Sequence, residues 1–88
     1  MSESGHPTKY TGAGDVSGGA GRVDRVFILV AGAGAPALAT IKEGGTGGTV
    51  VLELAALAGD TGHPIEASID SPFLSAISGA GASLIVLQ

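Results

Sequence analysis

The chain has 88 residues, a net charge of −4 and no cysteine. A chain of this length forms one domain with a thin core, and without cysteine it has neither disulfides nor thiolate metal sites to reinforce that core. The acidic balance and the three aromatic residues argue against binding to nucleic acid, which needs cations for the phosphates and rings for the bases, and against binding to an anionic membrane. We therefore expect added stability from self-association or from docking on a larger partner.

Residues 1–21 are rich in Gly and Ser and show almost no apolar periodicity. Such a composition buries too little apolar surface to offset the entropy of ordering the chain. The sequence therefore predicts a flexible, extended N-terminal arm that becomes ordered only against another subunit. Tyr10 and Val16 are the expected anchors of that contact, and the β-domain is expected to span residues 22–88.

Residues 22–31, RVDRVFILVA, predict the first strand because they are rich in β-branched and aromatic side chains and are flanked by glycines. Both faces of this strand are apolar. One face of such a strand covers the core, and the other meets a second layer or a subunit interface. The two sets of side chains are Val26, Ile28 and Val30 on one face and Phe27 and Leu29 on the other.

The rest of the chain consists of short apolar or alternating runs separated by Gly-rich turns. In residues 36–42, Leu38 shares a face with the polar side chains of Thr40 and Lys42. The side chains of residues 49–54 alternate with the two-residue period of a strand. The Ala-rich residues that follow have a high helix propensity, which leaves a helix over residues 51–58 as an alternative. Residues 72–77 are expected to form an apolar crossing segment. Further strands are predicted over residues 36–42, 49–54, 65–71 and 82–87.

Five or so short strands with regular Gly turns predict an all-β fold, either an antiparallel sandwich or a barrel. No motif for chemistry emerges. The glycine-rich stretches 12–21 and 32–37 lack the third glycine of a dinucleotide-binding loop, and no Gly-Lys-Ser/Thr sequence is present. Asp60, His63 and Glu66 span a turn and the start of a strand, a spacing that does not bring three side chains to one metal ion. We therefore expect no catalytic residue, no cofactor and no metal, and hence no enzyme.

The order of strand-like runs and Gly-rich turns in the chain resembles that of a known group of proteins. The runs ATIKE, GGTGG, TVVLEL, AALAGDTG and SPFLSAISGAGASLIVLQ are similar to small virion proteins of tailed bacteriophages, of the head-decoration or head-fibre kind. The resemblance covers residues 22–88. This chain has Ser75 and Ala76 where such proteins often carry a glycine, which leaves the register of residues 72–77 open.

The resemblance implies a small antiparallel jelly-roll-like β-sandwich without catalytic activity. It also implies a structural role on the capsid surface of the virion, as a decoration or stabilising (cement) subunit. The expected partners are the major capsid protein and further copies of the chain, most simply in a homotrimer. Interface candidates come from the arm, the first strand and the Pro-containing segment: Tyr10, Val16, Val26, Phe27, Ile28, Leu29, Phe73 and Leu74.

Two other functions compete with this prediction. A small membrane-active peptide of the bacteriocin type is suggested by the apolar, Gly- and Ala-rich run over residues 26–41. This run has 16 residues and contains Pro36, whereas a membrane-spanning helix needs about 20 residues. A non-enzymatic ligand-binding β-domain is the other alternative, and it requires a pocket that the low aromatic content does not suggest.

Overall fold

The computed structural model of the chain describes residues 7–18 and 22–87. Within these residues the fold is all-β, as the sequence predicts, and residues 51–58 do not form a helix. No helix in this described part is long and apolar enough to cross a membrane. The strands are β1 (Pro7–Tyr10), β2 (Gly14–Asp15), β3 (Asp24–Val30), β4 (Ala37–Glu43), β5 (Thr49–Ala56), β6 (Ile65–Ser68), β7 (Pro72–Ser78) and β8 (Ser83–Leu87).

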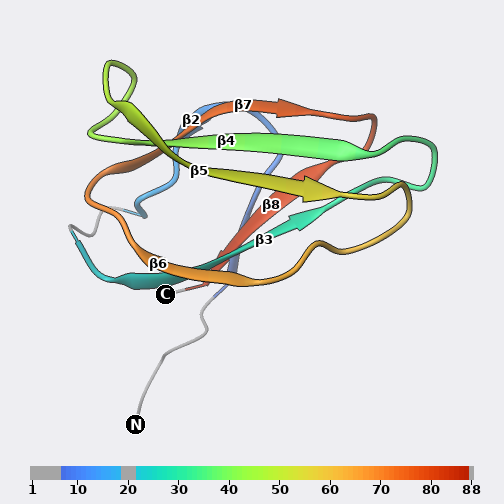
Figure 1. Ribbon diagram of the computed structural model, residues 1–88, viewed down its shortest axis with the longest axis horizontal. Helices are drawn as coiled ribbons and strands as arrows, with labels where there is room; N and C mark the ends of the chain where they lie inside the picture. The colour runs from blue at the N-terminus through green and yellow to red at the C-terminus, as the bar shows by residue number, and fades with distance from the viewer. Residues whose placement is uncertain (1–6, 19–21, 88) are drawn as a thin grey trace, which may run out of the picture.

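The strands form two four-stranded antiparallel sheets that lie in two layers (Figure 1). Sheet A, the lower layer in Figure 1, has the order β1-β8-β3-β6, and sheet B has the order β2-β7-β4-β5. β4 and β5 form a hairpin within sheet B, whereas every other connection between successive strands carries the chain from one sheet to the other. Each sheet therefore combines strands from both ends of the sequence.

The core lies between the two sheets and follows the two-residue alternation of the strands. On β3, Phe27 and Leu29 point into the core and are fully buried, while Val26, Ile28 and Val30 lie on the outer face and are half-buried. Complete burial of a Phe or Leu side chain is worth about 1.5–3 kcal/mol. The apolar core comprises Val16, Phe27, Leu29, Ala31, Ala37, Ala39, Ile41, Leu54, Ala56, Ile69, Leu74, Ala82, Leu84 and Val86.

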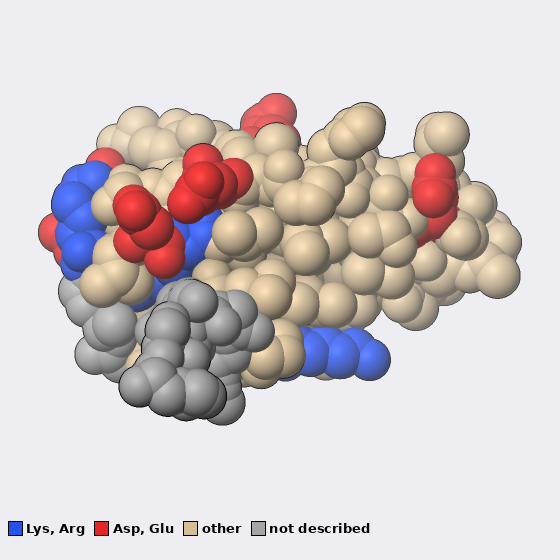
Figure 2. All heavy atoms as spheres, turned by 90° about the horizontal axis from the view of Figure 1, so that it is seen from below, with Lys and Arg blue, Asp and Glu red and all other residues tan. Residues whose placement is uncertain are grey.

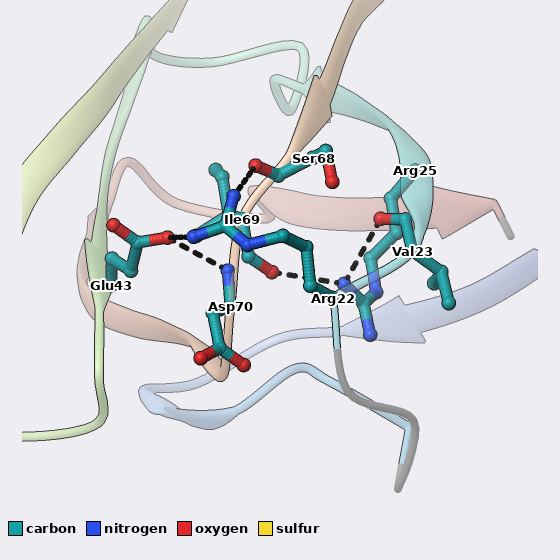
Figure 3. A network of polar contacts seen from close by, with 7 residues as sticks. All are labelled: Arg22, Val23, Arg25, Glu43, Ser68, Ile69 and Asp70. Carbon is teal, nitrogen blue, oxygen red and sulfur yellow. Dashed lines mark hydrogen bonds and ion pairs between the residues drawn. The ribbon is translucent and has the colours of Figure 1, made fainter.

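Arg25 occupies an inward position on β3 and is only 1% exposed. Its guanidinium group donates hydrogen bonds to the carbonyl oxygens of Ile69 at 3.1 Å and Val23 at 3.4 Å (Figure 3). It also donates to the carbonyl oxygen of Ser17 at 2.9 Å. A buried charge is tolerated when its donors are satisfied in this way. Arg25 thereby ties the segment after β2 and the segment after β6 to the start of β3.

Two loops close the opposite end of the molecule by direct contact between their backbones. A Cβ atom at Gly32 would lie 2.2 Å from the carbonyl oxygen of Ala80, and one at Gly79 would lie 2.4 Å from that of Pro36. Gly79 also has a φ of +108°, which glycine adopts without strain. The close approach of these turns therefore depends on glycine.

The N-terminal segment differs from its prediction as a flexible arm. β1 pairs with β8 from Pro7↔Leu87 to Tyr10↔Leu84, β2 pairs with β7, and the Val16 side chain is fully buried. The expectation of an arm is therefore wrong for residues 7–18, while residues 1–6 and 19–21 lie outside the described residues. The physical reason is that strand pairing uses backbone groups, so a Gly-rich segment with few apolar side chains still adds to the edge of its own sheet.

The Pro-containing segment also differs from its prediction. Instead of an apolar crossing segment, residues 72–78 form β7, which pairs with β2 on one side and β4 on the other. The register between β4 and β7 shifts between Thr40 and Ile41, so Ser75 stands outside the ladder. This bulge keeps Leu74 in the core and in register with Ile41.

Candidate interaction surface

Half of the interface residues predicted from the sequence are part of the core. Val16, Phe27, Leu29 and Leu74 all have 0% of their side chains exposed, so a partner cannot contact them while the subunit is folded. This is a correction to the predicted interface. The sequence identified apolar strands with two possible buried faces, but the alternation alone does not say which face is turned inward.

Two further candidates lie on different sheets. Tyr10, on the edge strand β1, is partly buried and packs against the core. Phe73 is half-buried on the outer face of sheet B, in register with Lys42 on β4 and Asp15 on β2. Neither side chain is placed next to Val26 or Ile28 by the strand pairing, so the predicted set does not form one surface.

Val26 and Ile28 belong to an apolar row on the outer face of sheet A, which we call the outer stripe. Val26 is in register with Leu87 and Ile28 with Ile85, and Val30 extends the row along β3. All of these side chains are half-buried. Figure 2 views the molecule from the side of sheet A and shows most of the charged side chains gathered at one end, an acidic side chain at the other end, and an uncharged band between them. The outer stripe consists of Val26, Ile28, Val30, Ile85 and Leu87.

Charged side chains flank the outer stripe on both neighbouring strands. Lys9 on β1 is in register with Ile85, and Glu66 on β6 is in register with Val26. Both charged residues are exposed. An aliphatic row between one cation and one anion is suited to a contact that is apolar at its centre and polar at its rim.

A second apolar surface lies on the hairpin of sheet B. Leu38 on β4, Val50 and Val51 on β5, and Leu57 just after β5 are exposed by 61%, 44%, 44% and 74%. We call these four residues the β4–β5 patch. Sequence reasoning did not select any of them as an interface residue. The sequence feature that could have identified this surface is Leu38, an apolar side chain on the same strand face as the polar side chains of Thr40 and Lys42.

A hollow opens beside Leu38 and Leu57, at the end of sheet B where β4 begins and β5 ends. Its volume is about 500 Å³. Its lining contains no charged residue and consists of Pro36, Ala37, Leu38, Ala55, Ala56, Leu57 and Ser78. Such a lining suits an aliphatic group and offers few polar atoms to orient a polar ligand.

The edge of β5 is less open to strand addition than its length suggests. The register between β4 and β5 shifts so that Ile41 pairs with Leu52 and Lys42 with Val50, which leaves Val51 in a bulge. Farther along, Gly62 approaches so closely that a Cβ there would lie 2.8 Å from the carbonyl oxygen of Ala55. A bulge and a covering segment are two ways in which proteins protect edge strands.

Charged groups at the end of the molecule near the start of β3 contact one another. Arg22 pairs with the Oε2 atom of Glu43 and donates to the carbonyl oxygen of Ser68 at 2.7 Å (Figure 3). The backbone N–H of Asp70 also donates to Glu43, at 2.9 Å. That hydrogen bond, together with the charge of Arg22, lowers the pKa of Glu43. These contacts join β4 to the connection between β6 and β7.

The other candidate chemical sites do not assemble. Asp60, His63 and Glu66 are exposed, and within residues 7–18 and 22–87 no group of three His, Asp or Glu residues comes together as a metal site. The glycine-rich stretch 32–37 forms the turn between β3 and β4 and includes the first residue of β4, and the described part of stretch 12–21 contains β2. The run over residues 26–41 is divided between β3 in sheet A and β4 in sheet B.

Comparison of the chain with protein-family models, with curated proteins and with solved structures found no match.

Proposed function

We propose that this chain is a structural protein of a bacteriophage virion, a decoration or stabilising subunit on the capsid surface. In this role it is a homo-oligomer, with the trimer as the expected form, and it docks on the major capsid protein. The proposal combines the resemblance of residues 22–88 to small phage virion proteins with the arrangement of the strands.

The strand order is the observation that carries the proposal. Eight strands in the orders β1-β8-β3-β6 and β2-β7-β4-β5 correspond to the order expected of a jelly roll built from two Greek keys. Capsid proteins are one of the groups that use this architecture, together with lectin domains and cupins. Because a fold hosts several functions, the strand order supports the proposal through its agreement with the sequence resemblance.

The outer stripe is the surface that we assign to docking on the shell. Its aliphatic side chains lie on the two central strands of sheet A, β3 and β8. A partner that covers them removes their remaining exposed apolar surface from water, which is worth about 25 cal/mol per Å² before the entropy cost of association. Val26 and Ile28, two of the interface residues predicted from the sequence, belong to this surface.

The experiment that tests the role is mass spectrometry of gradient-purified virus particles from a lysate in which the chain is expressed. We expect the chain to co-purify with the major capsid protein at a fixed ratio. A chain that is present in the lysate but absent from the particles would exclude a virion role.

Docking through the outer stripe is tested with particles stripped of this chain and incubated with recombinant protein. Ile28→Lys should weaken binding at least tenfold, because it places an ammonium group in the centre of the apolar row. Val23→Lys is the matched control, since Val23 is an exposed valine outside the stripe and should leave binding unchanged. Equal binding of both variants would refute docking through the outer stripe. It would not change the conclusion from mass spectrometry of the particles.

The hollow at the end of sheet B favours a second candidate, a small-ligand-binding β-domain. An uncharged lining around about 500 Å³ suits an aliphatic molecule. Titration with an apolar fluorescent dye would test it, with Ser78→Phe as the variant that fills the hollow. Binding that is saturable and lost in Ser78→Phe would support the ligand-binding function.

A further inference from the structure

Exposed apolar side chains are concentrated on one hairpin. Among the described residues, five large apolar side chains are exposed, and four of them belong to the β4–β5 patch; the fifth is Val23. Within the patch, Leu38 and Leu57 lie at the end of the hairpin beside the hollow, Val50 and Val51 lie near its other end, and Thr40 and Glu53 lie between the two pairs. Single exposed aliphatic residues are normal in soluble proteins, but a concentration of them marks an interaction site. Leu38 and Leu57 are the most exposed of the set, and both line the hollow.

The charges beside the patch permit contact between two copies of the chain. The outward positions of β4 and β5 carry one cation, Lys42, and one anion, Glu53, each in register with an uncharged residue on the neighbouring strand. The outward positions of these two strands are therefore neutral together, although the whole chain has a net charge of −4 and Asp15 lies on the far side of the same sheet face. Two copies that meet here do not bring together surfaces of like charge, which would cost several kcal/mol.

The area available on this face suits a second subunit. A stable interface buries about 800 Å² of each partner, roughly a sixth of the 4724 Å² surface of the subunit. β5 has eight residues, a length of about 27 Å, and the patch runs from Val50 near its start to Leu57 just beyond its end. A contact of this size therefore covers the hairpin along its whole length and continues onto the neighbouring strands of sheet B.

The contact must be made by side chains and not by strand addition. The bulge at Val51 and the approach of Gly62 to Ala55 protect the backbone edge of β5. The exposed side chains of the patch have no comparable cover within the described part of the subunit. A facing copy would cover them and would also insert aliphatic groups into the hollow.

We propose that copies of this chain bind one another through the β4–β5 patch and the adjoining hollow. This inference rests on the homo-oligomer of the proposed function and assigns the surface that holds it together. The occupant of the hollow is then an aliphatic side chain of a neighbouring copy, and we assign this role to Leu57, the most exposed large apolar side chain of the described residues.

Sedimentation velocity of the recombinant full chain at high micromolar concentration tests the proposal without any capsid. The wild type should sediment as an oligomer, and the double variant Leu38→Lys with Leu57→Lys should sediment as a monomer. Val23→Lys is the control that changes an exposed apolar residue outside the patch, and it should remain oligomeric. A monomeric wild type, or a double variant with the wild-type sedimentation coefficient, would overturn the proposal.

Chemical protection provides a second measurement that does not depend on the lysine variants. Because the chain has no cysteine, Leu57→Cys and Val23→Cys each introduce a single reactive thiol. Concentrating the protein should slow maleimide labelling at position 57 at least fivefold and leave labelling at position 23 unchanged. Equal rates at position 57 in dilute and concentrated protein would contradict the proposal. Either result is independent of whether the chain is found in virus particles.

Discussion

Two neighbouring glycines in the loop between β3 and β4 should respond very differently to alanine. A Cβ at Gly32 would lie 2.2 Å from the carbonyl oxygen of Ala80, whereas real Cβ atoms do not come closer than 3.0 Å to such an atom. The two loops must therefore separate by at least 0.8 Å, the difference between these distances. A Cβ at Gly34 would meet nothing within 4 Å.

The separation disturbs contacts on both sides of Gly32. Its carbonyl oxygen accepts a hydrogen bond from the N–H of Gly59, and the N–H of buried Ala82 donates to Gly79 at 3.1 Å within the facing turn. Forcing a methyl group into a packed region costs about 1–3 kcal/mol. We expect Gly32→Ala to lower the free energy of unfolding by about 2 kcal/mol and Gly34→Ala to change it by less than about 0.5 kcal/mol.

Urea unfolding monitored by far-UV circular dichroism measures both changes at equal protein concentration. With a typical slope of about 1–3 kcal/mol per M for a small protein, the midpoint of Gly32→Ala should fall by about 0.7–2 M. The midpoint of Gly34→Ala should stay within error of the wild type. Equal midpoints for the two variants would show that the backbone contact at Ala80 does not constrain the fold.

The remaining predictions concern burial, strain and pH. Phe27→Asp should abolish the β signal in circular dichroism because it buries an unpaired carboxylate, while the exposed His63→Ala should leave the urea midpoint unchanged. Val16→Ala should lower the free energy of unfolding by about 2 kcal/mol, and Val23→Ala, at a site that is 38% exposed, by much less. Ser71 has a φ of +48°, so Ser71→Gly should raise the urea midpoint by relieving up to about 1 kcal/mol of strain. The pKa of Glu43 is lowered from its ordinary value of 4.5, so its contribution to stability is present above that pH and is lost as the pH falls through the lower folded-state pKa. The urea midpoint should therefore fall on acidification below about pH 4.5, and by less in Glu43→Gln than in the wild type.

Apart from β7, the strands after residue 22 could be predicted because their side chains alternate and glycine turns separate them, although the strand predicted over residues 65–71 ends at Ser68. The segments 22–31 and 82–87 each carry apolar residues on both faces of the predicted strand. Their predicted ends lie within two residues of the ends of β3 and β8. β5 was predicted two residues short, because Ala55 and Ala56 carry no strong preference for a strand. The bulge at Val51 also turned Val50 outward, a change that a strict two-residue period cannot anticipate.

The N-terminal strands and the interface could not be predicted by the same reasoning. β1 and β2 join the sheets through backbone pairing, which leaves little trace in the side chains. In the predicted interface, Phe27 and Leu29 are as apolar as Val26 and Ile28, and only the position of the second sheet decides which pair is buried. Leu57 follows a run of alanines and was assigned to no face, yet it is the most exposed large apolar side chain of the described residues.

The two proposed surfaces belong to different layers of the molecule, and this separation has a consequence for assembly. The outer stripe lies on the outer face of sheet A, whereas the β4–β5 patch lies on the hairpin of sheet B. A subunit docked through the first surface keeps the second accessible, so neighbouring subunits on a shell can contact one another. Each contact then adds to the retention of every subunit through a raised effective concentration. A contact between copies that forms an oligomer only at high micromolar concentration in free solution is therefore sufficient for a stabilising layer.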